Sequence, residues 1–139
     1  MKQILKILWV ASVVVFAGCG KTTIEHKLVG TWNMQFFEKE PPYSKITWTF
    51  SADRKVTKNV DNGNKQYVGT YDVISKITDK GNYVVISGLS AEYGDSALAN
   101  DDGKYFIHKL TSDQLVIERV EAYGRTEGVY KWYEFVKEE

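Results

Sequence analysis

The stretch Lys45-Ile46-Thr47-Trp48-Thr49-Phe50-Ser51 alternates apolar and polar residues with a period of two. Ile46, Trp48 and Phe50 share one face, and threonines occupy the other. Successive side chains of a β-strand point to opposite faces of the sheet, so this pattern predicts a strand that is buried on one side and solvated on the other. The β-branched and aromatic residues that make up most of the stretch also favour strands.

Working outward from this stretch, strand patterns continue through the chain. Seven further segments carry them: Leu28–Phe37, Lys55–Val60, Gln66–Ser75, Asn82–Gly88, Lys104–Leu110, Gln114–Val120 and Gly128–Val136. The segments between them are rich in Gly, Asn, Asp and Ser, which are turn-forming residues. We find no pattern of helical period between the strands, so no parallel crossover is expected. The sequence therefore predicts an all-β fold, an eight-stranded antiparallel up-and-down barrel over residues 28–137.

The lengths of the connections predict that one end of this barrel is open. In an up-and-down barrel, alternate connections lie at the same end. The three long connections, Glu38–Ser44, Leu89–Asp102 and Ala122–Glu127, are the first, fifth and seventh, so they share one end. We expect this end to form the mouth, with both chain ends at the opposite end of the barrel.

The residues before the barrel have the pattern of a secretory signal peptide. Lys2 and Lys6 give a basic start, Ile7–Phe16 is an apolar run, and small residues follow. A helix that spans a membrane needs ~20 apolar residues, and this run is much shorter. We therefore expect residues 1–18 to be a cleaved signal peptide.

The end of this segment, Phe16-Ala17-Gly18-Cys19, resembles the lipobox of bacterial lipoproteins. The resemblance implies that Cys19 becomes the lipidated first residue, with palmitate among its acyl chains, and that residues 19–27 are a polar tether. It also implies attachment to the outer membrane of the cell envelope. The residues after Cys19 lack the acidic run that accompanies surface export in that group, which favours the periplasmic face over the cell surface. Cys19 is the only cysteine, so no intramolecular disulfide can form.

Three pieces of the barrel region resemble the lipocalin-like lipoproteins of Bacteroidetes: Leu28-Val29-Gly30-Thr31-Trp32, Thr47-Trp48-Thr49-Phe50 and Leu110-Thr111-Ser112-Asp113-Gln114-Leu115. In lipocalins the tryptophan of the Gly-x-Trp motif closes the barrel floor, and a late arginine packs on it. The resemblance thus implies a floor of Gly30, Trp32 and Arg119, with Arg125 as the alternative arginine. Arg119 shares a strand face with Leu115 and Ile117, so we expect it to point inward.

An eight-stranded barrel is either filled by its side chains or holds one small ligand. The candidate inward aromatic residues are Phe36, Trp48, Phe50, Tyr67, Tyr71 and Tyr105. They are either core or the lining of a pocket for a small hydrophobic or amphipathic molecule. An inward arginine is costly without a partner, so Arg119 is expected to meet Trp32, an inward carboxylate or an anionic ligand head.

These features predict a lipid-anchored envelope protein that binds a small hydrophobic or amphipathic ligand. The alternative is a protein- or glycan-interaction module with a filled barrel. It would act through the mouth loops Pro41-Pro42-Tyr43, Glu92-Tyr93-Gly94-Asp95 and Tyr123-Gly124-Arg125, which combine tyrosines with charges.

Catalytic and nucleic-acid functions find no support in the sequence. Gly88-Leu89-Ser90-Ala91-Glu92 lacks the final glycine of a nucleophile elbow, and His26 and His108 with one cysteine cannot build the usual zinc sites. We therefore expect no enzyme activity, catalytic residue, metal or cofactor. The whole chain has 18 basic and 18 acidic residues, so loss of Lys2 and Lys6 leaves the mature chain slightly acidic. A nucleic-acid binder needs a basic patch, so no nucleic-acid partner is expected, and the protein is expected to be a monomer.

The lipidation of Cys19 can be measured directly. Cells that express the chain and are fed radiolabelled palmitate should incorporate label into the wild-type protein. They should not incorporate it into Cys19→Ala, because the thiol that accepts the lipid is absent. Equal labelling of both proteins would contradict the predicted anchor.

Overall fold

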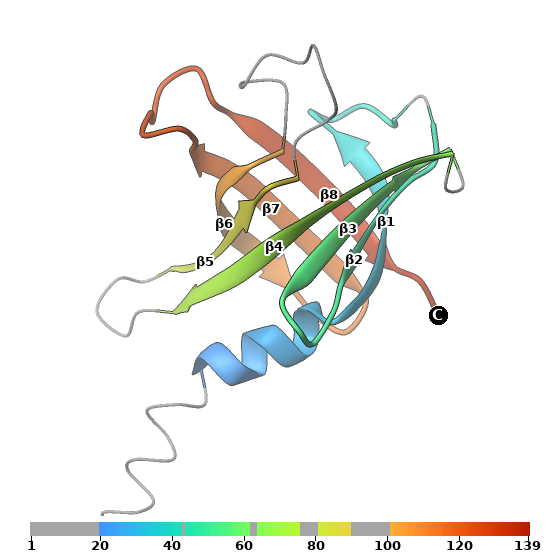
Figure 1. Cartoon of the computed structure of the whole chain (residues 1–139), viewed down its shortest axis with the longest axis horizontal. Coiled ribbons are helices and arrows are strands. Elements are labelled where there is room, and N and C mark those ends of the chain that lie inside the picture. Colours follow the sequence, from blue (N-terminus) through green and yellow to red (C-terminus); the bar gives the residue numbers. More distant parts are fainter. Residues whose placement is uncertain (1–19, 43, 62–63, 76–80, 90–100) are drawn as a thin grey trace, which may run out of the picture.

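The computed structural model describes residues 20–42, 44–61, 64–75, 81–89 and 101–139. Its eight strands are β1 (Gly30–Phe37), β2 (Ile46–Phe50), β3 (Lys55–Val60), β4 (Lys65–Ser75), β5 (Asn82–Ser87), β6 (Gly103–Leu110), β7 (Gln114–Glu121) and β8 (Lys131–Lys137). Each strand pairs antiparallel with the next, and β8 pairs antiparallel with β1, so the barrel is closed (Figure 1). The predicted eight-stranded antiparallel up-and-down barrel is confirmed. The last strand begins at Lys131, three residues later than predicted.

The two ends of the barrel differ in what lies on them. We call the end where β1 begins and β8 ends the floor, and the opposite end the mouth. A helix over residues 20–28 lies beneath the floor, and the C-terminus emerges on the same side (Figure 1). The described residues of the connections between β1 and β2, β3 and β4, β5 and β6, and β7 and β8 belong to the mouth. Residues 1–19 lie outside the described chain, so the predicted signal peptide and Cys19 remain predictions.

The barrel interior is packed around the indole of Trp48, which is fully buried. The ring centroids of Tyr133 and Phe135 lie 5.1 Å from that of Trp48, and the centroid of Tyr105 lies 6.2 Å away. Phe50 continues the cluster towards the floor at 6.4 Å. These inward aromatic residues therefore form the protein core at the level of Trp48.

Residues 20–28 form a helix where a polar tether was expected. Ile24 and Leu28 are four residues apart and lie on one helix face, where both pack against the barrel core. Leu28 is fully buried, and its carbonyl oxygen accepts a hydrogen bond of 2.8 Å from Nε1 of Trp32. The prediction of a tether was wrong because one apolar pair in so short a segment gives no periodic pattern. Within the described chain, no helix is long and apolar enough to cross a membrane.

Ion pairs also join this helix to the barrel. Arg54, which follows β2, lies 3.2 Å from Glu25 and 2.6 Å from Asp72 of β4, and Lys21 lies 3.1 Å from Asp72. The side chain of Asp72 is half exposed, and exposed pairs contribute only ~0–1 kcal/mol each. Burial of an apolar side chain such as Leu28 contributes ~1.5–3 kcal/mol. Burial of Leu28 is therefore the main attachment of the helix.

The β1 strand departs from regular alternation near the mouth. Its register against β8 shifts between Met34 and Phe36, which is a β-bulge. The bulge adds a residue to β1, so the residues beyond it change faces. Phe36 pairs with Glu134 on the outer face, whereas Phe37 pairs with the inward Tyr133 and stacks on its ring at 5.2 Å, and both phenylalanines are about 40% exposed. The expectation that Phe36 points into the barrel is wrong for this reason.

Because the helix is docked on the barrel through Leu28, we expect substitutions at two neighbouring helix positions to differ in their effect on the free energy of unfolding. Leu28→Ala should lower the free energy of unfolding by about 2–5 kcal/mol, because it opens a cavity between helix and barrel. Lys27→Ala, at an exposed position of the same helix, should change it by no more than ~0.5 kcal/mol. Urea denaturation followed by tryptophan fluorescence measures both, and similar small effects would show that the segment does not support the fold.

Candidate ligand-binding site at the barrel mouth

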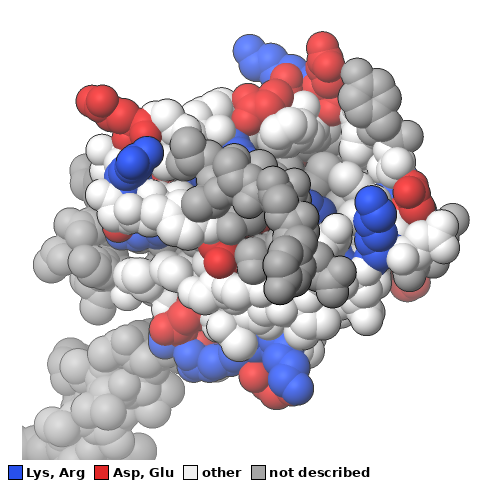
Figure 2. All heavy atoms as spheres, turned by 45° about the horizontal axis from the view of Figure 1, so that its top comes forward, with Lys and Arg blue, Asp and Glu red and all other residues white. Residues whose placement is uncertain are grey.

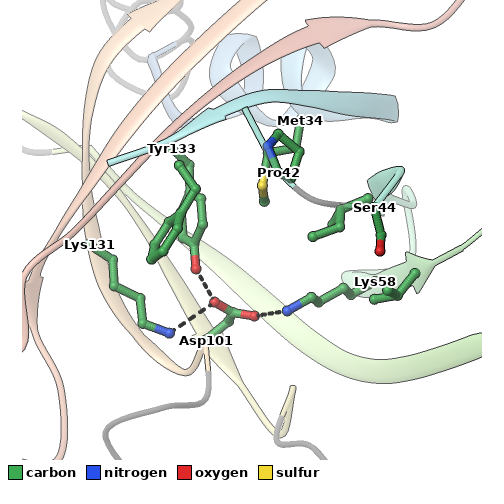
Figure 3. A pocket seen from close by; sticks show the side chains of 10 residues that line it. Met34, Pro42, Ser44, Lys58, Asp101, Lys131 and Tyr133 are labelled. Atoms are coloured by element: carbon green, nitrogen blue, oxygen red, sulfur yellow. Dashed lines mark hydrogen bonds and ion pairs between the residues drawn. The ribbon is translucent and has the colours of Figure 1, made fainter. Parts of the chain in front are cut away.

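A buried carboxylate, that of Asp101, lies at the mouth immediately before β6 and is 2% exposed. The Nζ of Lys58, from β3, lies 2.5 Å from Oδ2 of Asp101. The Nζ of Lys131, from β8, lies 3.3 Å from Oδ1, and the hydroxyl of Tyr133 donates a hydrogen bond to the same oxygen. Figure 3 shows the two lysines reaching the carboxylate from opposite sides of the barrel.

Strand alternation explains why both lysines point inward. Lys58 lies between Val56 and Val60 on the inward face of β3, and Lys131 precedes Tyr133 on the inward face of β8. Both lysines occupy the part of the strand nearest the mouth, so their aliphatic stems lie against the protein while their ammonium groups meet at Asp101.

The backbone around Asp101 is held by several further hydrogen bonds. The hydroxyl of Tyr105 donates to the carbonyl oxygen of Asp101 at 2.7 Å. The neighbouring carboxylate, that of Asp102, accepts from the backbone N–H groups of Gly88 at 2.9 Å and Leu89 at 2.6 Å. These bonds join the two ends of the connection between β5 and β6, so the position of Asp101 is fixed by the barrel itself.

Arg119 is buried and inward, as predicted, but it does not lie on the floor. The β7 strand runs from floor to mouth, and Arg119 is close to its mouth end, where it pairs with Lys131. Its Nε donates to the carbonyl oxygen of Val129 at 2.6 Å, and its Nη1 donates to that of Asp102 at 3.0 Å. The prediction of a floor contact with Trp32 is therefore wrong. Arg119 instead links the connection that precedes β6 and the connection that precedes β8 to strand β7.

At the floor, Gly30 and Trp32 lie together as expected, and Lys137 takes the place expected for Arg119. The Nζ of Lys137 lies 5.3 Å from the ring centroid of Trp32, which is within the range of a cation–π interaction. Gly30 has a φ of 139°, and a Cβ there would lie 2.5 Å from Cε of Lys137. The glycine of the Gly-x-Trp motif is favoured here by this positive φ, whereas the flexible end of the Lys137 side chain could move away from a Cβ.

A pocket of about 320 Å³ opens at the mouth beside the charged cluster. Its lining comes from β1, β2, β3 and β8 and from the residues next to them: Met34, Phe37, Pro42, Ser44, Ile46, Lys58, Val60, Asp101, Lys131 and Tyr133. In Figure 3, Met34 and Pro42 lie across the pocket from Asp101. The pocket therefore has an apolar wall and a charged wall.

The protonation states in the cluster follow from its burial. Burial alone would raise the pKa of Asp101, but the ammonium groups of Lys58 and Lys131 and the hydrogen bonds from Lys58 and Tyr133 hold it below its ordinary value. Burial, followed by the charge of Asp101, raises the pKa values of Tyr105 and Tyr133 well above their ordinary range. At neutral pH the carboxylate is thus ionised, and both phenols are protonated donors.

Four of the six aromatic residues proposed from the sequence as ligand contacts belong to the core. Trp48, Phe50, Tyr71 and Tyr105 are buried, and none of them lines the mouth pocket. The hydroxyl of Tyr71 donates to the carbonyl oxygen of Ser51 near the floor. Tyr67 is half-buried near the mouth, with its ring centroid 5.9 Å from Nζ of Lys58.

A second pocket, of about 270 Å³, lies at the floor between the 20–28 helix and the end of β2. Glu25 and Arg54 line it, and they already form the ion pair that joins helix to barrel. The floor pocket is therefore part of the helix-docking interface, and the mouth pocket is the better candidate for ligand binding.

Of the mouth loops expected to bind a partner, Tyr123 is described and is half exposed. Tyr43 and residues 92–95 lie outside the described chain. Figure 2 is turned so that the top of Figure 1 comes forward, and it shows acidic and basic side chains of the described residues interspersed on this face.

Sequence reasoning missed the residues that form the charged wall. Lys58 could have been found, because it shares a strand face with Val56 and Val60. Lys131 and Tyr133 required knowledge of which face of the last strand points inward. Asp101 lies in a connection between strands. Such a segment has no alternating pattern of apolar and polar residues from which burial could be predicted.

Searches with the chain against protein-family models, curated proteins and solved structures find no match.

The ionised state of Asp101 predicts a pH-dependent stability difference. Asp101→Asn should lower the free energy of unfolding at pH 7 by about 3 kcal/mol, because it removes the buried anion that pairs with the partly buried ammonium groups of Lys58 and Lys131. The folded pKa of Asp101 is lowered, so its contribution is complete above the unfolded pKa of ~3.9 and is lost as the pH falls through the folded value. Unfolding curves at several pH values should therefore show the two proteins converging in acid. A difference that stays constant with pH would contradict the assignment.

Proposed function

We propose that the protein binds a small amphipathic molecule in the mouth pocket. The observation that carries the proposal is the composition of the pocket, with an apolar wall that includes Met34, Ile46 and Val60 and a charged wall of Lys58, Asp101 and Lys131. A ligand with an apolar part and a polar part can satisfy both walls at once, whereas a purely apolar one would leave the charges desolvated.

Pocket size and preorganisation support this proposal. A volume of about 320 Å³ is at the lower end of the ~300–1,000 Å³ typical of small-molecule sites. Asp101 is held by the barrel on both its backbone and its carboxylate, so little side-chain entropy is lost when a ligand binds beside it. The packed aromatic interior around Trp48 supports a site at the mouth and not within the lumen.

A binding role is also favoured over catalysis. The carboxylate of Asp101 is engaged on both oxygens, and the neighbouring phenol of Tyr133, whose pKa is raised by burial, loses its proton only far above neutral pH. Neither group is poised to accept a proton from a substrate at neutral pH.

The proposal includes the location inferred from the sequence. The mature chain is anchored through lipidated Cys19 to the outer membrane, on its periplasmic face, and acts there as a monomer. The floor position of the 20–28 helix supports this arrangement, because it keeps the residues next to Cys19 at the end of the barrel opposite to the pocket.

Two matched substitutions test the pocket. Val60→Trp places a large ring in the pocket and should weaken binding of a fluorescent amphiphile, anilinonaphthalene sulfonate, by at least about tenfold, equivalent to ~1.4 kcal/mol. Val68→Trp, on the exposed outer face of the neighbouring strand, should leave the affinity unchanged. Binding is measured by fluorescence titration, and equal loss or equal retention in the two variants would argue against the mouth pocket.

A further inference from the structure

The side chain of Lys131 lies inside the mouth pocket, which is an uncommon place for a lysine. It is 12% exposed, and it lines the pocket together with the apolar residues Met34, Ile46 and Val60. Lysine carries a strongly hydrated charge, and most lysines keep the ammonium group in water. Strand alternation directs this one inward, because Lys131 shares the inward face of β8 with Tyr133. A primary amine is thus placed beside an apolar surface.

The surroundings of Lys131 make its amine more nucleophilic than that of a solvated lysine. Burial is the largest influence and lowers the pKa of Lys131. The charge of Asp101 opposes this effect, the nearby cations Arg119 and Lys58 reinforce it, and the pKa lies below its ordinary value. Desolvation and a neighbouring cation are the two means by which proteins activate a lysine as a nucleophile. Lys131 therefore has a larger neutral fraction at neutral pH than a lysine in water.

The carboxylate of Asp101 is placed to stabilise the product that such an amine forms with an aldehyde. Its Oδ1 lies 3.3 Å from Nζ of Lys131, and the carboxylate is ionised at neutral pH (Figure 3). When a lysine condenses with an aldehyde, the nitrogen of the protonated imine keeps one N–H and one positive charge. The nitrogen can therefore keep its ion pair with Asp101. Because the charge of the cluster does not change, the reaction leaves no buried ion unpaired.

We propose that Lys131 binds an aldehyde with an apolar chain as a protonated imine, with the chain against the apolar wall of the mouth pocket. This inference rests on the proposed function and specifies its ligand class. The ammonium group of Lys131 first releases a proton to water, and the nitrogen attacks the carbonyl carbon. The hydroxyl group that forms takes up a proton and leaves as water, so a C=N bond replaces the C=O bond. The step needs no oxidant or reductant.

Reductive trapping tests the proposal on the full chain in nanodiscs of phosphatidylcholine, a lipid without a primary amine. Octanal is added with sodium cyanoborohydride, which reduces the imine to a stable octyl amine, and peptide mass spectrometry identifies the labelled lysine. At pH 7, Lys131 should be labelled at least about tenfold faster than Lys104, which lies over the Tyr83 ring outside the pocket. Acetaldehyde has no chain to cover the apolar wall, so its preference for Lys131 should be much smaller. Equal labelling of the two lysines by octanal would overturn the proposal.

Two matched variants show which amine reacts. In Lys131→Arg the guanidinium keeps a positive charge beside Asp101 but stays protonated, so the label at position 131 should be lost. Lys104→Arg, outside the pocket, should leave the labelling of Lys131 unchanged. Thermal unfolding verifies that both variants are folded. If Lys131→Arg does not fold, the peptide map of the wild type decides.

The pH dependence gives a readout that mere accessibility of a lysine would not change. The pKa of Lys131 is lowered, so its advantage over Lys104 should be largest near neutral pH. The advantage should shrink as the pH rises towards the ordinary pKa of lysine, because both amines are then neutral. A ratio of the two labelling rates that stays constant with pH would overturn the assignment of Lys131 as an activated amine.

The outcomes separate this inference from the proposed function. If octanol displaces anilinonaphthalene sulfonate from the wild type but octanal labels Lys131 no faster than Lys104, the imine is wrong while the proposed function stands. If neither octanol nor octanal displaces the probe, and Val60→Trp does not slow the labelling of Lys131, the proposed function itself is overturned. Labelling of Lys131 that Val60→Trp slows supports both.

Discussion

The indole of Trp48 fills the centre of the barrel, and the position of the binding site depends on this packing. Its buried N–H has no hydrogen-bond partner among the described residues, which costs ~1–3 kcal/mol. Burial of an aromatic ring of 150–250 Å² contributes about 4–6 kcal/mol at 25 cal/mol per Å², so packing outweighs the lost hydrogen bond. Around this packed centre, the two pockets described above lie at the ends of the barrel. The floor is covered by the 20–28 helix, and the mouth is the end where charged and apolar walls face one another.

The barrel was predictable from the sequence because its main determinant is local. In β2, the alternation of Ile46, Trp48 and Phe50 specifies a strand without reference to its neighbours. The two features that differ from the predicted barrel, the bulge in β1 and the 20–28 helix, depend on contacts between residues that are distant in sequence. The bulge after Met34 arises in pairing with β8, about a hundred residues later, and it turns Phe36 outward. The 20–28 helix is stabilised by burial of Leu28 against the completed barrel, which a short segment cannot reveal by itself.

The site was less predictable than the fold, and Arg119 illustrates the reason. Alternation correctly placed its side chain inside, but the resemblance to lipocalins assigned it to the wrong end. The sequence already contained the information to correct this, since Arg119 lies three residues before the 122–127 connection that was assigned to the mouth. At the floor, Lys137 provides the cation over Trp32. The central residue of the site, Asp101, lies in a connection and belongs to no periodic pattern. Its position depends on tertiary contacts, such as the hydrogen bond from the hydroxyl of Tyr105 to its carbonyl oxygen.

The arrangement of the two ends restricts how a ligand can reach the protein. Leu28 fixes the 20–28 helix against the floor, so residue 20 is held at that end without a slack linker. If Cys19 carries lipid, as proposed, the floor is the side of the barrel nearest the membrane. The mouth pocket, with Lys58 and Lys131, then faces away from the bilayer that holds the anchor. A ligand of the proposed kind would therefore enter from the aqueous side or from a facing surface, and it would not diffuse laterally out of the anchoring membrane.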